Sequence, residues 1–178
     1  MDALRPIRRV SQIRRFTDEP VPDVVVDQLL ELARWTGSAG NSQPWEFVVV
    51  RDPDIRRKLA GVRPAIGWAA AAPVAIAIVL STPMMPMFDA YDEGRVTERL
   101  LTGATLLGYG GGVAWYGDPE REAEAKRILG IPASLTARQF VAIGRPRPRT
   151  DSALPGLGRG RKPLRELVSY DHYGNDKR

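Results

Sequence analysis

A loop between residues 35 and 45 is rich in amide and hydroxyl side chains. Its sequence is WTGSAGNSQPW, and Ser38, Asn41 and Gln43 place hydrogen-bonding groups within a few residues of one another. A plain turn needs only one or two such residues, so this composition indicates a planar, polar ligand with several heteroatoms. A helix end followed by an asparagine turn would give a similar composition, and residue chemistry alone leaves both readings open.

Basic side chains near both ends of the chain could bind an anionic group. Arginines gather near the N-terminus, among them those at positions 8, 9, 14 and 15, and the pair Arg161 and Lys162 follows a Gly- and Pro-rich stretch at 150–160. A guanidinium can hold a phosphate through two parallel hydrogen bonds. A solvated helix face and a solvated tail are the alternative explanations.

Several kinds of chemistry are disfavoured by what the chain lacks. It has no cysteine, which removes disulfides, thiolate metal sites and cysteine nucleophiles. Its single histidine is His172, so a histidine zinc site or a Ser-His-Asp triad would have to form around that residue. We therefore expect no metal site and no nucleophile of these kinds, and no other side chain is an obvious acid or base.

The net charge of +5 and the pI near 9.9 come mostly from arginine. Acidic residues are interleaved with the basic ones, as in 120–127, which favours a solvated surface over a nucleic-acid-binding face. A basic nucleic-acid-binding domain remains an alternative, based on the charge and on the Gly-Arg-Gly-Arg run at 158–161. Arginines interrupt any apolar stretch at the N-terminus, so we expect no signal peptide and a cytoplasmic location.

Alternating helix and strand patterns indicate how these groups are positioned. A length of 178 residues predicts one domain over 1–178. Residues 1–15 have a helical pattern, and a helix is expected from Asp23, as its N-cap, to just before Gly37. Further helices are expected at 53–59, from Pro64, at 93–107 and at 119–129, and strands at 47–50, 74–80 and 140–144. The continuous apolar run at 74–80 predicts a central strand buried on both faces.

Two stretches without a clear element remain. Residues 81–91 form a Met- and Pro-rich loop whose Met85, Met87 and Phe88 could line a substrate pocket or fill gaps under the loop. Residues 107–112 read LGYGGG, but Val113 stands where a dinucleotide-binding GxGxxG motif requires its third glycine, and no strand precedes the run. We therefore reject a Rossmann fold.

Taken in order, these motifs resemble the FMN-dependent nitroreductase family over nearly the whole chain. The N-terminal part is IRRFTDEPVP at 13–22, and the polar loop ends in NSQPW at 41–45. Later matches are LGYG at 107–110, LGIP at 129–132 before the last strand, GRP at 144–146 and RKPL at 161–164. The family usually has Arg and Ser where Val10 and Gln12 stand, and an aromatic residue at Arg145.

The resemblance implies an α+β protein with the nitroreductase fold, a central, mostly antiparallel sheet flanked by helices. It implies a single FMN-binding domain over 1–178 and an intertwined homodimer, in which the 38–43 loop reaches the flavin of the neighbouring subunit. Arg14 falls on the family's second basic position, near the N1/O2 edge of the flavin. The implied FMN contacts are Arg9, Gln12, Arg14, Ser38, Asn41, Gln43, Gly110, Gly111, Gly112, Arg161 and Lys162.

The implied activity is NAD(P)H-dependent reduction of nitroaromatic, quinone or similar small-molecule acceptors by a ping-pong scheme. The chemistry then belongs to FMN, with NADH or NADPH as the reductant. A flavoprotein of the same fold could instead carry out reductive dehalogenation or flavin breakdown, or bind FMN without turnover.

Overall fold

A four-stranded antiparallel sheet lies at the centre of the first of two units, Met1–Arg147 and Pro148–Arg178. The computed structural model describes residues 4–81, 86–148 and 161–175. The strands are β1 (Trp45–Val50), β2 (Val74–Leu80), β3 (Gly110–Trp115) and β4 (Gln139–Gly144), in the order β1-β2-β4-β3. Every residue of β2 is buried, which confirms the expected central strand.

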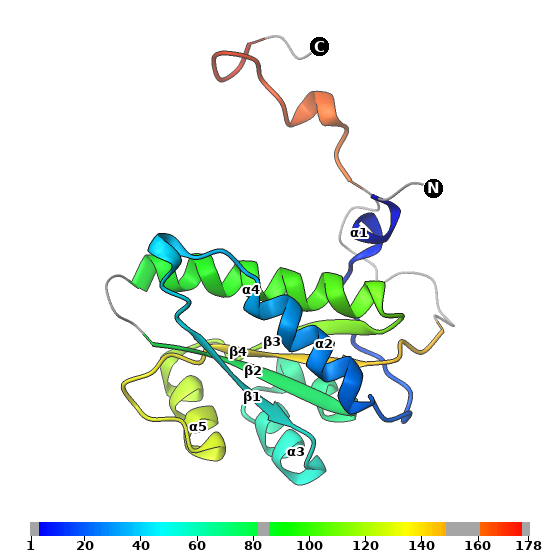
Figure 1. Ribbon diagram of the computed structural model, residues 1–178, viewed down its shortest axis with the longest axis vertical. Coiled ribbons are helices and arrows are strands. Elements are labelled where there is room, and N and C mark those ends of the chain that lie inside the picture. Colours follow the sequence, from blue (N-terminus) through cyan, green and yellow to red (C-terminus); the bar gives the residue numbers. More distant parts are fainter. Residues whose placement is uncertain (1–3, 82–85, 149–160, 176–178) are drawn as a thin grey trace. The chain divides into compact units, whose positions relative to one another are not determined.

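Helices cover both faces of this sheet, as Figure 1 shows. On one face lie α2 (Asp23–Arg34) and α4 (Pro86–Leu106), and on the other lie α3 (Pro53–Gly61), the 3₁₀ helix η2 (Pro64–Ala71) and α5 (Pro119–Leu129). Alternate β2 residues therefore enter different cores: Ile76 packs with Leu29 and Leu100, whereas Ala75 packs with Leu59 and Phe140. The expected α+β architecture is confirmed for this unit.

The helix ends follow the local sequence signals in two places. The Asp52 side chain accepts hydrogen bonds from the Asp54 and Ile55 backbone amides, and so caps α3. Asp118 caps α5 in the same way, and Gly130 ends that helix in the left-handed conformation, with φ 69°.

The N-terminal prediction is wrong in two respects. The helix expected over 1–15 is only α1 (Arg5–Arg9), and the residues after Val10 run extended beside β3. The apolar residues at 4, 7 and 10 have helical spacing, but the chain after Val10 forms backbone hydrogen bonds with β3 and does not continue the helix. In one of these bonds, Ile13 N donates to Gly111 O at 2.8 Å. In addition, Asp23 is the first residue of α2, and the N-cap position belongs to Pro22.

The loop expected over 81–91 is also wrong in part. The helix α4 already begins at Pro86, a residue suited to a first turn, so Met87 and Phe88 are helical; Met85 lies outside the described residues. The glycine-rich run at 110–112 is the first half of β3, a strand that the sequence analysis did not identify. Glycine has a low strand propensity, which is why the pattern was missed.

The second unit contains the 3₁₀ helix η3 (Leu164–Glu166) within residues 161–175. Four of its apolar residues are exposed: Leu164 at 72%, Leu167 at 61%, Tyr170 at 46% and Tyr173 at 104%. The expected single domain over 1–178 stays a prediction. Within the described ranges, no helix combines the length and apolar character needed to cross a membrane.

Candidate functional site

Residues 12–16 form an extended strip along the free edge of β3. Gln12 forms a parallel bridge with Gly111, and the Gln12 side-chain oxygen Oε1 accepts a hydrogen bond from Val113 N at 2.8 Å. Further along the strip, Phe16 forms an antiparallel bridge with Pro146. The strip thus takes up hydrogen-bonding groups that an open sheet edge would expose, and it holds Gln12 on a rigid support.

The strip carries Arg14, and Arg9 precedes it at the end of α1. Both side chains are exposed, and neither forms a salt bridge with a carboxylate of the described residues. The Arg14 guanidinium carbon lies 5.7 Å from the centre of the Trp68 ring. Two positively charged side chains therefore lie close to Gln12 in the sequence, which suits an anionic ligand.

The three glycines of β3 are required by packing within the chain. A Cβ at Gly110 would lie 2.6 Å from Ile13 Cγ1, and one at Gly111 would lie 2.6 Å from Leu101 Cδ2. At Gly112 it would lie 2.2 Å from Ile13 O. These contacts alone explain why side chains are absent here. The role of the glycines in admitting a cofactor stays a prediction.

The polar loop after α2 has an unusual backbone. Gly40, Asn41 and Gln43 have φ values of 58°, 55° and 47°, in the left-handed region that side chains other than glycine rarely adopt. Ser38 Oγ accepts a hydrogen bond from Gln43 N at 2.9 Å and so stabilises this turn. The side chains of Asn41 and Gln43 are exposed. Such backbone strain is concentrated at functional sites, which supports the prediction that this loop binds a ligand.

Within one chain, the strip and the loop lie apart. A Cβ at Gly37, just before the loop, would lie 2.7 Å from Nη2 of Arg95, in the first half of α4. The strip instead contacts Gly110–Gly112, beyond the last residue of α4. Figure 1 shows the same separation, with the two segments near opposite ends of α4.

A surface cavity of about 450 Å³ adjoins the loop. Apolar side chains of Leu30, Trp45 and Phe47 line it together with polar ones of Asp27, Glu31, Arg34 and Gln43. Hydrogen bonds from Arg34, and next from Trp35, lower the pKa of Glu31 to about 2. Gln43 is the predicted site residue that reaches this cavity.

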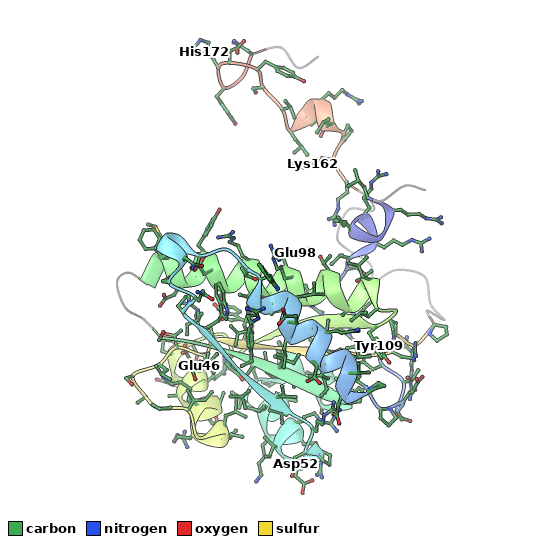
Figure 2. All side chains as sticks on the ribbon, in the orientation of Figure 1. Glu46, Asp52, Glu98, Tyr109, Lys162 and His172 are labelled. Atoms are coloured by element: carbon green, nitrogen blue, oxygen red, sulfur yellow. The ribbon has the colours of Figure 1, made fainter. Side chains whose placement is uncertain are left out.

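The structure does not bring the remaining predicted site residues together in one site. Met87 and Phe88 lie in the first turn of α4, and their exposed fractions are 68% and 37%. They do not line the cavity beside Gln43. They also do not line a second cavity, of about 470 Å³, next to Arg51 and Arg56. Arg161 and Lys162 are exposed in the second unit, and Figure 2 shows the Lys162 side chain projecting from its segment. The assignments of these residues stay predictions.

Two features near the strip were not identified from the sequence. The first is Trp68, which lies in the helix that was expected to begin at Pro64. The second is Arg145, whose guanidinium carbon lies 4.7 Å from the centre of the Tyr109 ring and whose Nε donates to Glu19 Oε1 at 2.6 Å. Tyr109 lies just beyond the end of α4 (Figure 2). The unusual arginine at 145, where the family has an aromatic residue, was the available signal.

This chain is similar to known proteins over most of its length, and a family model matches the part that contains the strip and the polar loop. A family model described as the Nitroreductase family matches residues 7–67, which include the strip and the polar loop. The NADH dehydrogenase of Thermus thermophilus is 30% identical over 206 residues, with 94% of this chain and 95% of the relative covered. An Archaeoglobus fulgidus protein with the provisional name NADH dehydrogenase/NAD(P)H nitroreductase is 30% identical over 84% of this chain and 88% of its own length.

Solved structures extend the comparison to the fold. The FMN-dependent nitroreductase from Clostridium difficile R20291 superposes with a TM-score of 0.79 at 20% identity, covering 94% of this chain and 98% of that one. At this identity the likeness establishes the fold, and the fold is the one expected from the sequence.

Proposed function

Because this chain belongs to the nitroreductase family, we propose that it is an FMN-dependent enzyme that uses NADH or NADPH to reduce a small-molecule acceptor. Membership makes the chain an oxidoreductase. The cofactor, the hydride donor and the acceptor class of nitroaromatics or quinones are the proposal. The Clostridium difficile structure of the same fold is named as FMN-dependent, which supports the choice of cofactor.

The residues of the strip fit this cofactor. FMN carries a phosphate and a pyrimidine edge whose N1 and O2 atoms accept hydrogen bonds. Arg14 of the strip and Arg9 of α1 form no salt bridge with a carboxylate of the described residues, and the strip adds the NH2 group of Gln12. This match between donors and acceptors is the observation that carries the proposal. Ser38, Asn41 and Gln43 would add polar contacts from the strained loop.

When bound, FMN supplies the transfer of a hydride from NAD(P)H to the acceptor, and the two substrates use the site in turn. The task of Arg14 is electrostatic. A fixed cation beside the N1/O2 edge stabilises negative charge there and so raises the reduction potential. Gln12 would contribute a hydrogen-bond donor, and Arg9 would hold the phosphate. For Arg161 and Lys162, a contact with the phosphate stays a prediction.

A homodimer would complete the site. The strip and the loop lie at opposite ends of α4 in one chain, so both can reach one flavin only if a second copy supplies the loop. The exposed apolar side chains of the second unit are available for burial in such an assembly. We therefore propose a homodimer with FMN at the interface.

Reductive dehalogenation is a second candidate function. Iodotyrosine deiodinase 1 of Rattus norvegicus is 43% identical over 47 residues, which is 26% of this chain and 16% of that protein. The match is local, so it supports a related site more than a shared substrate. Turnover of halogenated tyrosines compared with nitroaromatics would separate the two reactions.

An absorbance spectrum of the purified protein tests the cofactor directly. We expect a yellow protein that releases FMN on denaturation and oxidises NADH or NADPH when a quinone or nitroaromatic is present. Arg14→Ala should weaken FMN binding or lower the reduction potential. A colourless protein that does not bind added FMN, or that binds DNA or RNA in a salt-sensitive manner instead, would contradict the proposal.

A further inference from the structure

Trp68 of η2 is wedged between two other segments of the first unit. Its ring centre lies 6.4 Å from that of Phe16, on the strip, and a Cβ at Gly112 would lie 2.6 Å from its Cη2 atom. The missing side chain at Gly112 is thus what lets the indole lie against β3. Trp68 is half-buried, so part of the ring remains open to the surface that carries Arg14.

The Arg14 guanidinium lies over this ring. Its central carbon is 5.7 Å from the ring centre, within the range of about 6 Å for a cation–π interaction. No carboxylate of the described residues forms a salt bridge with Arg14. Without the contact to the Trp68 ring, an exposed arginine would sample many rotamers and would lose that conformational freedom on binding a ligand.

We propose that Trp68 is a positioning residue that holds the Arg14 guanidinium ready for the flavin. This inference rests on the proposed function, in which Arg14 contacts FMN. Trp68 acts through Arg14 and not through the cofactor itself. A tryptophan that only filled space would affect the stability of the fold, but its effect on FMN binding would not depend on the residue at position 14.

A double-mutant cycle tests this dependence. Trp68→Leu, Arg14→Ala and the double variant would be compared with wild type for FMN dissociation constant, flavin midpoint potential and thermal unfolding. We expect Trp68→Leu to weaken FMN binding about two- to fivefold, the size of an exposed cation–π contact, and to lower the midpoint potential. In the Arg14→Ala background, the same change should weaken binding no further.

Trp68→Phe keeps an aromatic face and should restore most of the affinity. If the leucine variant does not fold, the same cycle can be run with Trp68→Met, which also removes the aromatic face but fills more of the space of the indole. Equal losses in both backgrounds, or no loss in either, would overturn the positioning role while leaving the FMN proposal intact. If wild-type protein fails to bind FMN at all, both proposals are overturned together.

Discussion

The side chain of Gln12 replaces a strand carbonyl at the edge of the sheet, because its Oε1 accepts a hydrogen bond from Val113 N at 2.8 Å. The backbone of the next residue pairs with the same strand, where Ile13 N donates to Gly111 O. Of the two polar atoms of the amide, only the oxygen can accept from an N–H group, so the orientation of the Gln12 amide is fixed. Its NH2 group, which can only donate, is then the part that we propose a ligand meets.

Gln12→Glu should therefore separate folding from cofactor binding. The glutamate keeps an oxygen for Val113 N, so thermal stability should stay close to wild type. It loses the donor and adds a negative charge near an anionic ligand, and we expect FMN affinity to fall at least about tenfold, corresponding to about 1.4 kcal/mol. Fluorescence titration with FMN measures this loss.

Gln12→Leu is the matched control, because it removes both groups. The Val113 amide then has no side-chain acceptor, and the free energy of unfolding should fall by about 1 kcal/mol. Unchanged FMN affinity in the glutamate variant would remove Gln12 from the cofactor site.

Much of the fold could be predicted because local signals and tertiary packing agree. The apolar run of β2 is buried throughout, and Asp52, Asp118 and Gly130 act at the helix ends where their side chains or backbone suggest. The strip could not be predicted, because its hydrogen bonds to β3 join residues that are about a hundred positions apart. β3 itself was hidden by glycines whose side-chain space is occupied by Ile13, Leu101 and Trp68.

The candidate site likewise contains residues that could be predicted from the sequence and residues that could not. Arg14 and the polar loop became candidates because their residue types carry the chemistry, whereas Gln12 became one only through the family resemblance. Trp68 was not a candidate, since its proposed role depends on which side chain lies above its ring. The distance between the strip and the loop within one chain could be found only from the three-dimensional arrangement.

Gly112→Ala should disrupt the strip. The added Cβ would lie 2.2 Å from Ile13 O and 2.6 Å from Trp68 Cη2, and a backbone oxygen on the strip can move only if the strip leaves the sheet edge. We expect a loss of about 3 kcal/mol in the free energy of unfolding, measured by urea denaturation, and weaker FMN binding.

Gly94→Ala provides the comparison for this change. Gly94 is an exposed residue within α4, and its Cβ would meet nothing within 4 Å. Alanine is a better helix former than glycine, so this variant should be more stable by about 0.5–1 kcal/mol. If both alanine variants were equally stable, the close contacts at Gly112 would not be what excludes a side chain from this position.

Replacing Arg161 and Lys162 together by alanine tests the predicted phosphate contact. Because this pair is expected to meet the phosphate and not the ring, the affinity for FMN should fall while the affinity for riboflavin, which lacks the phosphate, stays unchanged. Arg14→Ala should instead weaken both ligands, since its expected contact is the pyrimidine edge. Equal FMN affinity in the double variant and wild type would show that the second unit does not bind the cofactor.

A buried ion pair joins α4 to the start of β4. Arg138 Nε donates to Glu93 Oε2 at 2.8 Å, and the two side chains are exposed at only 26% and 8%. Burial raises the pKa of Glu93 above its ordinary value of 4.5, Arg138 lowers it in part, and the nearby carboxylates of Glu122 and Asp89 raise it. The folded protein therefore holds the Glu93 proton to a higher pH than the unfolded chain does.

Arg138→Met should make stability strongly dependent on pH. It removes the cation that lowers the pKa of Glu93, so the pKa in the folded state rises further and the free energy of unfolding falls as pH increases through it. At pH 8 we expect a loss of about 3 kcal/mol relative to wild type, because a buried charge is left without its partner. At pH 5 the carboxyl can take up a proton, and the loss should be smaller. Urea denaturation at both pH values measures the difference, and adding Glu93→Leu should abolish its pH dependence. A loss of the same size at pH 5 and pH 8 would mean that Glu93 is not the titrating group.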